Sequence, residues 1–302
     1  MAPPRELPAW RSLLFVPVNI PRFVEKAHLR DADVIMLDLE DSIAPSEKES
    51  ARHLVQDAAK KVSRNGAEVA VRINAPLSLA VRDLEEVISP LVTVINLPKI
   101  ESGAQIELLS ECVAELESAR GMRVGSTRFK LIVETAKGVM ALQDITRAVQ
   151  LEPRVVAMTL GSEDFTLTSG MVPEPDSLYV PNVLTVVAAR AAGVLPLGFV
   201  GSIADISDLG GFRLIVQRSK KLGFVGASCV HPSQVPILNE EYGVSDAEAE
   251  RARRIVTAAR RELESGRAAF EMDGAMIDIP VVRRAELVLR RYESIQARRR
   301  PV

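Results

Sequence analysis

The fold is decided by FKLIVETAKG, residues 129–138, and VVAMTLGSEDF, residues 155–165. In each stretch a short apolar run, typical of a buried strand, gives way to small residues and an acid, Glu134 in the first and Asp164 in the second. An acid is out of place at the end of a buried strand unless something there needs its negative charge. Mg2+ is the natural candidate, because it takes one or two carboxylates and leaves its other positions to water and substrate. The pair therefore predicts a metal-dependent enzyme, although each acid could instead cap the helix that follows it.

The composition excludes several classes of protein. The chain has 302 residues and is 47% hydrophobic, which is enough for the core of a single barrel domain. A formal net charge of -2 gives no support for a nucleic-acid partner or for attraction to a membrane. The two cysteines, Cys112 and Cys229, fit a reduced compartment. The N-terminal stretch lacks the apolar core of a signal peptide and no apolar run is long enough to span a membrane, so we expect a soluble cytoplasmic protein.

Short apolar runs alternate with longer amphipathic stretches along the chain. The predicted strands are Ser12–Val18, Val34–Leu39, Glu68–Ile73, Val92–Leu97, Phe129–Val133, Val155–Leu160, Leu197–Ile203 and Ala227–Val230. The predicted helices between them are Ser46–Val62, Leu79–Ile88, Ser102–Ala119, Gly138–Leu151, Leu184–Ala192 and Leu209–Leu222. Near-continuous hydrophobicity is typical of parallel strands covered on both faces. Eight such units predict an α/β fold, a (β/α)8 TIM barrel. An open doubly wound sheet is the alternative, but no GxGxxG motif follows the first strand and there is no P-loop.

Polar residues gather where such a barrel would have its active site. The catalytic residues of TIM barrels lie at the C-terminal ends of the strands. Asp38 and Glu40 follow the second predicted strand, and Arg72 ends the third. Glu134 and Asp164 follow the fifth and the sixth. The positions of these side chains therefore agree with the predicted barrel.

The pattern changes after the eighth predicted strand. A long charged helix is predicted over Val244–Gly266, with Ser245 as its N-cap, and a last helix over Val281–Ala297. We therefore predict two parts, a barrel domain over residues 1–241 and a C-terminal helical extension over residues 242–302. The extension follows the eight predicted strand–helix units of the barrel, and we interpret it as a lid.

Eight motifs occur in an order that resembles one enzyme family. They are RSLLFVPVN, VIMLDLEDSIAPSEKESAR, VRIN, NLPKIES, VETAKGV, LGSEDF, LGFVGASCVHPSQV and DGAMIDIP. In this order and spacing the chain resembles the citrate lyase β-subunit-like branch of the HpcH/HpaI aldolase family. The resemblance extends from Arg11 to Tyr292.

The resemblance implies a Mg2+-dependent barrel enzyme that makes or breaks a carbon–carbon bond beside a CoA thioester, with Mn2+ as an alternative metal. The implied substrate is a 3-hydroxyacyl-CoA such as citramalyl-CoA, malyl-CoA or citryl-CoA. The implied products are an acyl-CoA, such as acetyl-CoA, and a 2-oxo acid. Members of this branch form homotrimers, so a homotrimer is implied here as well.

The resemblance also assigns residues by position. Glu134 and Asp164 match the family's metal carboxylates, and Arg72 matches the arginine that meets the substrate's carboxylate or carbonyl oxygens. Asp278 matches an acid that relatives donate to the active site of a neighbouring subunit. Glu40 lies in the segment near the mouth of the site and is counted as catalytic with Arg72 and Asp278.

Three basic residues match positions implied to bind CoA. Arg22 and Lys26 fall around the first helix, where relatives place contacts to the phosphates of CoA. Lys48 belongs to the same segment as Glu40. We expect all three to bind the cofactor part of the substrate.

Four departures from the family pattern point to a changed substrate. Val18 replaces a glycine, and Pro181 stands where the family commonly has an arginine, at the expected start of a helix. Residues 197–202 differ from the usual strand-seven motif, and Gly226 is not followed by the usual lysine.

Several alternatives stay open at this stage. Lys99 could form a Schiff base, but the metal carboxylates would make that chemistry redundant. Arg72 could be a buried ion-pair partner of Glu40, and Asp278 could cap the last helix. The rival functions are a metal-dependent aldolase or thioesterase on a related substrate, and a β subunit that works only inside a larger citrate lyase-like complex.

Overall fold

The computed structural model describes residues 6–203 and 206–299. Contacts divide the chain into a unit that ends at Tyr242 and a second unit that begins at Gly243. Each unit has a hydrophobic core of its own. Within the described residues, no helix combines the length and the hydrophobicity that crossing a membrane requires.

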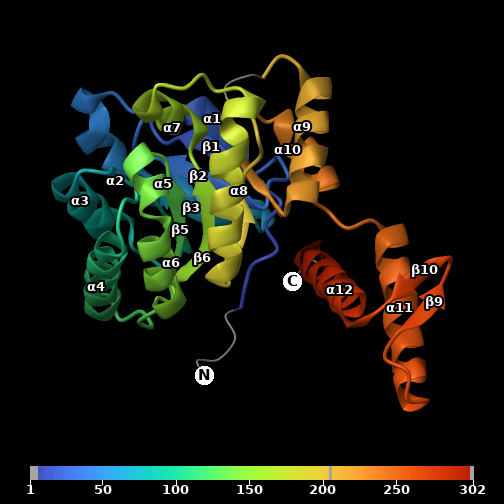
Figure 1. Ribbon diagram of the computed structural model, residues 1–302. Helices are drawn as coiled ribbons and strands as arrows, with labels where there is room; N and C mark the ends of the chain where they lie inside the picture. The colour runs from blue at the N-terminus through green and yellow to red at the C-terminus, as the bar shows by residue number, and fades with distance from the viewer. Residues whose placement is uncertain (1–5, 204–205, 300–302) are drawn as a thin grey trace. The chain divides into compact units, whose positions relative to one another are not determined.

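The first unit alternates strands and helices (Figure 1). Its strands are β1 (Ser12–Pro17), β2 (Val34–Asp38), β3 (Glu68–Arg72), β4 (Val94–Leu97), β5 (Arg128–Val133), β6 (Val155–Leu160), β7 (Leu195–Leu197) and β8 (Ala227–Cys229). Its helices are α1 (Pro21–Ala27), α2 (Lys48–Val62), α3 (Leu77–Val87), α4 (Gly103–Ala119), α5 (Ala136–Met140), α6 (Leu142–Leu151), α7 (Ser162–Ser169), α8 (Pro175–Ala191), α9 (Leu209–Leu222) and α10 (Gln234–Glu241). Two short 3-10 turns, Pro45–Glu47 and Ser63–Asn65, flank α2.

The eight strands form a nearly closed parallel barrel, which confirms the predicted (β/α)8 fold. Neighbouring strands pair in the order β7-β6-β5-β4-β3-β2-β1-β8. The two ends of this sheet meet at a parallel bridge between Leu197 and Gly226. The amide of Gly198 donates to the carbonyl of Gly226 at 2.8 Å, and the amide of Val225 donates to the carbonyl of Pro196 at 3.1 Å. This junction brings the two edge strands of the sheet together.

Alternating side chains along the strands build two separate cores. Leu13, Val34, Met36, Ala70 and Val94 belong to one buried cluster, which fills the inside of the barrel. Their neighbours in sequence on the same strands belong to a larger cluster, which packs between the strands and the surrounding helices. Residues two apart on a strand face the same side, so the strand register predicts which side chain lies in each layer of the barrel.

A polar layer lies directly above this apolar filling. Asp38 pairs in register with Arg72, Arg72 with Asn96, and Asn96 with Lys130. Each of these residues is two positions after an inward-facing residue or in register with one, so the four share the barrel interior. The polar layer is the floor on which the site at the C-terminal ends of the strands is built.

The prediction for the seventh strand was wrong. The sequence predicted Leu197–Ile203, whereas β7 covers only Leu195–Leu197. Gly198 has a φ of 138°, which turns the chain out of the strand, and an added Cβ there would lie 3.2 Å from the ring of Phe224. The apolar residues Phe199 and Val200, which suggested a strand, are buried against the outer core without strand pairing.

Two helix starts also differ from the prediction. The helix predicted from Ser46 begins later, because Ser46 lies in a 3-10 turn and α2 begins at Lys48 without a side-chain cap. Pro181 does not stand at a helix start, because α8 begins at Pro175 and Pro181 lies within the helix. Nearby side chains bond to the backbone around this proline: Asn182 donates to the carbonyl of Leu178 at 2.9 Å.

The second unit is a helix, a hairpin and a further helix. It contains α11 (Asp246–Glu264), β9 (Phe270–Met272), β10 (Ala275–Ile277) and α12 (Ile279–Arg299). The structure bears out Ser245 as the N-cap of α11, since Ser245 and Glu248 form a full capping box. The hairpin was not predicted, although its turn residues Asp273 and Gly274 have the positive φ values that Asp-Gly turns favour. Its side chains share a core with both helices.

Candidate active site

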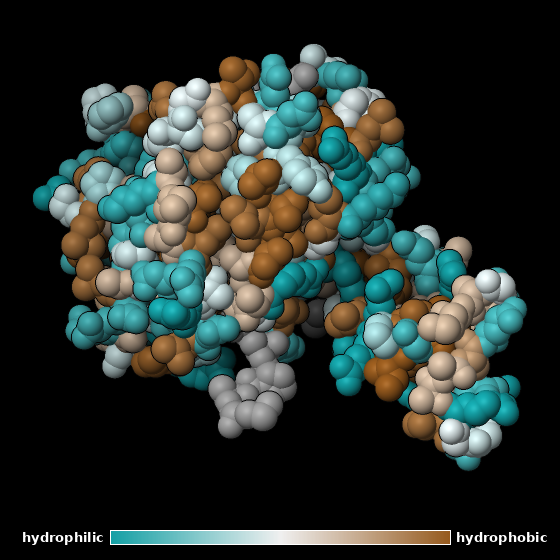
Figure 2. Space-filling model, in the orientation of Figure 1, coloured by the Kyte–Doolittle hydropathy of each residue, from teal (hydrophilic) through white to brown (hydrophobic). Residues whose placement is uncertain are grey.

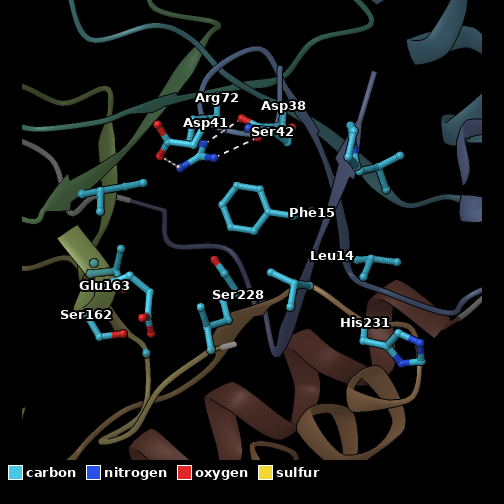
Figure 3. A pocket seen from close by; sticks show the side chains of 18 of the residues that line it. Leu14, Phe15, Asp38, Asp41, Ser42, Arg72, Ser162, Glu163, Ser228 and His231 are labelled. Atoms are coloured by element: carbon cyan, nitrogen blue, oxygen red, sulfur yellow. Dashed lines mark hydrogen bonds and ion pairs between the residues drawn. The ribbon is translucent and has the colours of Figure 1, made fainter. Parts of the chain in front are cut away.

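A cavity with a volume of about 950 Å³ opens at the C-terminal ends of the barrel strands. This size suits a small-molecule ligand. Its walls come from β1, β2, β3, β5, β6 and β8 and from the loops and helices that follow them. Figure 3 shows side chains from several of these segments pointing into one space. The cavity therefore lies where the barrel fold places an active site.

The two predicted metal carboxylates both line this cavity. Glu134 follows β5 directly and is 3% exposed, whereas Asp164, in the first turn of α7, is partly exposed. Oε1 of Glu134 accepts a hydrogen bond of 2.7 Å from the backbone amide of Lys99, which fixes the carboxylate. An added Cβ at Gly161 would lie 2.6 Å from Cβ of Glu134. Glu134 can therefore occupy its position only because residue 161 has no side chain.

The electrostatics of the acid pair favour a bound cation. The pKa of Glu134 is raised to about 7, because burial, Glu40 and Asp164 all disfavour its charge, while Lys99 opposes them. A divalent cation would relieve this repulsion, and carboxylate oxygens are the ligands that Mg2+ prefers. Within the described ranges no group of three or more His, Cys, Asp or Glu residues could hold a metal. A site of two carboxylates fits Mg2+, which commonly completes its coordination with water and substrate.

Arg72 is held by acids on the neighbouring strand and loop. Its Nε and Nη2 donate to Asp38 at 2.7 and 2.8 Å, and its Nη1 lies 3.0 Å from Glu40 and 3.3 Å from Asp41. Figure 3 shows the guanidinium beside Asp38 and Asp41, with the ring of Phe15 next to it. The ring centroid is 4.9 Å from the guanidinium carbon, a cation–π distance. Arg72 is thus both a buried ion-pair partner and a part of the cavity wall.

Glu40 connects the arginine to Lys99. Glu40 is 5% exposed, and its Oε1 accepts a hydrogen bond of 2.8 Å from Nζ of Lys99. Lys99 also lies 3.4 Å from Asp164. Burial alone would lower the pKa of Lys99, but the hydrogen bond and the charge of Glu40 raise it above its usual value. A lysine held as an ammonium is a poor nucleophile, so the geometry does not support a Schiff base at Lys99.

The structure separates the three basic residues that were expected to bind CoA. Arg22 and Lys26, on α1, are exposed and line the cavity rim, and Arg30 joins them just after the helix. Lys48 is absent from the described lining of the cavity. Its ammonium donates to the carbonyls of Leu39 and Glu40 and to Oδ1 of Asn74. Lys48 therefore holds the loop after β2 in place.

Asp278 belongs to the second unit. Its Oδ1 accepts a hydrogen bond of 3.2 Å from the amide of Val281, in the first turn of α12. The carboxylate therefore caps α12, which is the alternative role that the sequence left open for Asp278. A capping bond leaves the second carboxylate oxygen available for other contacts.

Sequence reasoning missed some residues of the cavity. Phe15, Lys130, Thr159 and Ser228 all line it, and each sits inside a run that reads as an ordinary strand. The signal that could have found Lys130 is a lone charged residue in the apolar run FKLIV. Burying a lysine in the middle of a strand covered on both faces costs free energy unless its amine has a partner.

Comparison with known proteins agrees with this geometry. The family described as HpcH/HpaI aldolase/citrate lyase matches residues 11–232. The citrate lyase subunit beta of Leuconostoc mesenteroides subsp. cremoris is 34% identical over 284 residues, which covers 93% of this chain and 92% of that protein. The L-malyl-CoA/beta-methylmalyl-CoA lyase of Rhodobacter capsulatus is 32% identical over 314 residues, which covers 96% and 97%.

A solved structure is similar over nearly the whole chain. It is protein CitE from Mycobacterium tuberculosis in complex with magnesium, acetoacetate and coenzyme A. The TM-score is 0.72 at 30% sequence identity, and the match covers 93% of this chain and 97% of that chain. The fold and the order of the elements are therefore shared, including elements of the second unit.

Proposed function

The chain belongs to the HpcH/HpaI aldolase/citrate lyase family, and we propose that it is a Mg2+-dependent carbon–carbon lyase of CoA thioesters. It would cleave a 3-hydroxyacyl-CoA, such as citramalyl-CoA, malyl-CoA or citryl-CoA, into an acyl-CoA and a 2-oxo acid, or condense the two in reverse. The observation that carries this proposal is the buried Glu134 beside Asp164 at the mouth of the barrel. The free thiols of Cys112 and Cys229 agree with a cytoplasmic reaction.

Glu134 and Asp164 would hold the metal ion. When bound, Mg2+ supplies a Lewis acid that polarises the oxygens of the oxo-acid part of the substrate. Mn2+ suits the same oxygen ligands. The fixed orientation of Glu134, through the amide of Lys99 and the space at Gly161, keeps its carboxylate ready for the ion.

Arg72 would orient the substrate's carboxylate. Two nitrogens of Arg72 donate hydrogen bonds to Asp38, so the guanidinium is already oriented before the substrate binds. Glu40 bonds to Lys99 and lies against Arg72 without lining the described cavity. We therefore assign Glu40, first counted as catalytic, to positioning these two cations.

The basic rim would bind the CoA part of the substrate. Arg22 and Lys26 lie at the rim of the cavity with their side chains in solvent, which suits contacts to phosphate groups. Lys48 would act indirectly, by fixing the loop that carries Glu40 and Asp41.

The unit that begins at Gly243 would act as a lid that brings an acid to the site. We propose that Asp278, donated by a neighbouring subunit, holds or moves the proton at the acyl carbon. Acid–base groups placed in this way contribute about 10²- to 10⁴-fold to the rate. A closing lid would also exclude water from the reacting carbanion.

The proposed assembly is a homotrimer, and α8 offers a surface for it. Val180, Leu184 and Val187 follow one another at helical spacing, with exposed fractions of 61%, 47% and 60%. Figure 2 shows an apolar patch over this helix. Light scattering is expected to give three times the monomer mass for the wild type and a smaller mass for Leu184→Asp. A monomeric wild-type protein would contradict this assembly.

The function is tested by acyl-CoA release from malyl-CoA, β-methylmalyl-CoA, citramalyl-CoA and citryl-CoA, with Mg2+ and then with EDTA. We expect cleavage of at least one thioester with Mg2+ and loss of that cleavage with EDTA, because the acids alone cannot polarise the substrate. Return of activity on adding excess Mg2+ is the control for damage by the chelator.

The outcomes of this panel separate the rivals. Turnover of CoA-free hydroxy acids, without acyl-CoA release, would favour a simple aldolase. No turnover of the panel by a protein that still binds Mg2+ would favour a subunit of a larger complex, as the similarity to a citrate lyase subunit beta suggests.

A further inference from the structure

Lys130 lies in the polar layer of the barrel, and the mechanism above does not use it. It is 1% exposed and lines the cavity from β5. Glu134 lies four residues later and Ile132 lies between them on the same face. At a rise of about 3.3 Å per residue, the backbone positions of Lys130 and Glu134 are roughly 13 Å apart. Lys130 is therefore at the floor of the cavity and the acid pair is at its mouth.

Among the described residues, the ammonium of Lys130 has one hydrogen-bond partner, and that partner is neutral. Nζ donates to Oδ1 of Asn96 at 3.2 Å. Among the residues that the structure describes, no carboxylate oxygen lies within 4.0 Å of it. The other deeply buried cations differ: Arg11, Arg52 and Arg154 each lie 2.8 to 2.9 Å from a carboxylate.

Burying a cation without a neighbouring carboxylate costs free energy, and this cost lowers the pKa of the amine. Burial lowers the pKa of Lys130 to about 7, and the charge of Arg72 acts in the same direction, while Glu134 opposes them. The amine is therefore close to balance between its neutral and charged forms near neutral pH. A bound anion would shift the balance to the ammonium and form the ion pair that the protein itself does not provide.

We propose that Lys130 receives a second carboxylate on the oxo-acid part of the substrate. Within the proposed function, on which this inference rests, the preferred 2-oxo acid is then a diacid with one carboxylate near Glu134 and Asp164 and the other directed to the floor. An apolar substituent would leave Lys130 without a partner. The amine is thus a specificity-determining group, and Asn96 positions it.

The test is calorimetric binding of three 2-oxo acids to the Mg2+-saturated protein. Oxaloacetate carries the second carboxylate, pyruvate lacks it, and 4-methyl-2-oxopentanoate has an isopropyl group of similar shape in its place. We expect oxaloacetate to bind most tightly. Lys130→Met should weaken oxaloacetate about 10- to 100-fold, the usual effect of losing a hydrogen bond to a charged group. Pyruvate should change by less than about threefold, because it does not reach the amine.

A second measurement needs no variant and stands even if Lys130→Met fails to fold. At pH 8 the amine is mostly neutral, so oxaloacetate should take up close to one proton on binding and pyruvate none. The uptake follows from the binding enthalpy in two buffers with different ionisation enthalpies. For the Lys130→Met variant, the matched control is Lys137→Met, at an exposed lysine on α5, which should bind all three acids as the wild type does.

The outcomes distinguish this inference from the proposed function. An unchanged ratio of oxaloacetate to pyruvate affinity in Lys130→Met, or equal proton uptake with both acids, would overturn the role of Lys130 alone. Failure of the Mg2+-loaded wild type to bind any of the three acids would overturn the proposed function and the inference together.

Discussion

Replacing Glu134 with Gln is expected to lower kcat/KM by on the order of 10³-fold, since a bound metal stabilises the transition state by several kcal/mol. Gln keeps the shape of the side chain but removes the negative charge that would bind the metal ion. Mg2+ affinity, measured by calorimetry, should fall in the same variant. Asp164→Asn should act in the same direction, through the other carboxylate of the pair.

The matched control for this prediction is Glu111→Gln, the same change at an exposed position on α4. This control should retain both Mg2+ binding and turnover. A Glu134→Gln protein that keeps its Mg2+ affinity and loses less than about tenfold in kcat/KM would show that the metal is held elsewhere.

Replacing Arg72 with Met is expected to cost about 3–5 kcal/mol in the free energy of unfolding, because Asp38 and Glu40 stay buried without their main cation. Urea unfolding at neutral pH measures this loss. The exposed pair of Lys60 and Asp57 offers the control, since Lys60→Met should cost at most about 1 kcal/mol. A loss in Arg72→Met no larger than in this control would mean that Arg72 does not stabilise the barrel.

The pH dependence of the Arg72 variant has a definite sign. Burial raises the pKa of Asp38, but the hydrogen bonds and charge of Arg72 outweigh burial and hold it below its usual value. A lowered pKa contributes stability above the unfolded value, near 3.8, and this contribution is lost as pH falls through the folded value. The stability of the wild type should therefore approach that of Arg72→Met as the pH falls below about 4. A constant difference down to acidic pH would contradict the ion-pair account.

Activity separates the charge of Arg72 from its shape. Arg72→Lys keeps a positive charge but cannot grip Asp38 with two parallel bonds. We expect this variant to recover part of the stability and little of the turnover, because in the proposed function the guanidinium plane orients the substrate's oxygens. Full turnover in Arg72→Lys would reduce the role of Arg72 to charge alone.

The sequence predicted most of the barrel because six of its strands are mainly apolar segments of four to six residues with clear limits. The seventh strand failed for a local reason. The strand β7 covers only Leu195–Leu197, with Pro196 at its centre, and Gly198 turns the chain out of the strand directly after it. Phe199 and Val200 continue the apolar pattern without strand pairing. Hydrophobicity reports burial, and burial on the outer face of a barrel does not require a strand.

The candidate site was predictable where the side chain alone decides the chemistry. Glu134 and Asp164 lie in one cavity because acids that end buried strands of a barrel converge. The position of Lys48 in the motif was evident from the sequence, but the direction of its ammonium, toward Leu39, Glu40 and Asn74, was not. Lys130 needed the strand register, since only the pairing of Asn96 with Lys130 shows that it joins the polar layer. Register depends on contacts between distant segments, which a single sequence does not display.

The clearance at Gly161 has an evolutionary consequence. Its φ of -89° is one that any residue adopts, so alanine would meet no resistance from the backbone. The methyl group would instead enter the space of the Glu134 side chain. We therefore expect a substitution at residue 161 to displace Glu134 and to lower activity, even though both acids are still present in the sequence. In a homologue with both acids but a larger residue at this position, we expect the same displacement of the glutamate, although the motif would look complete.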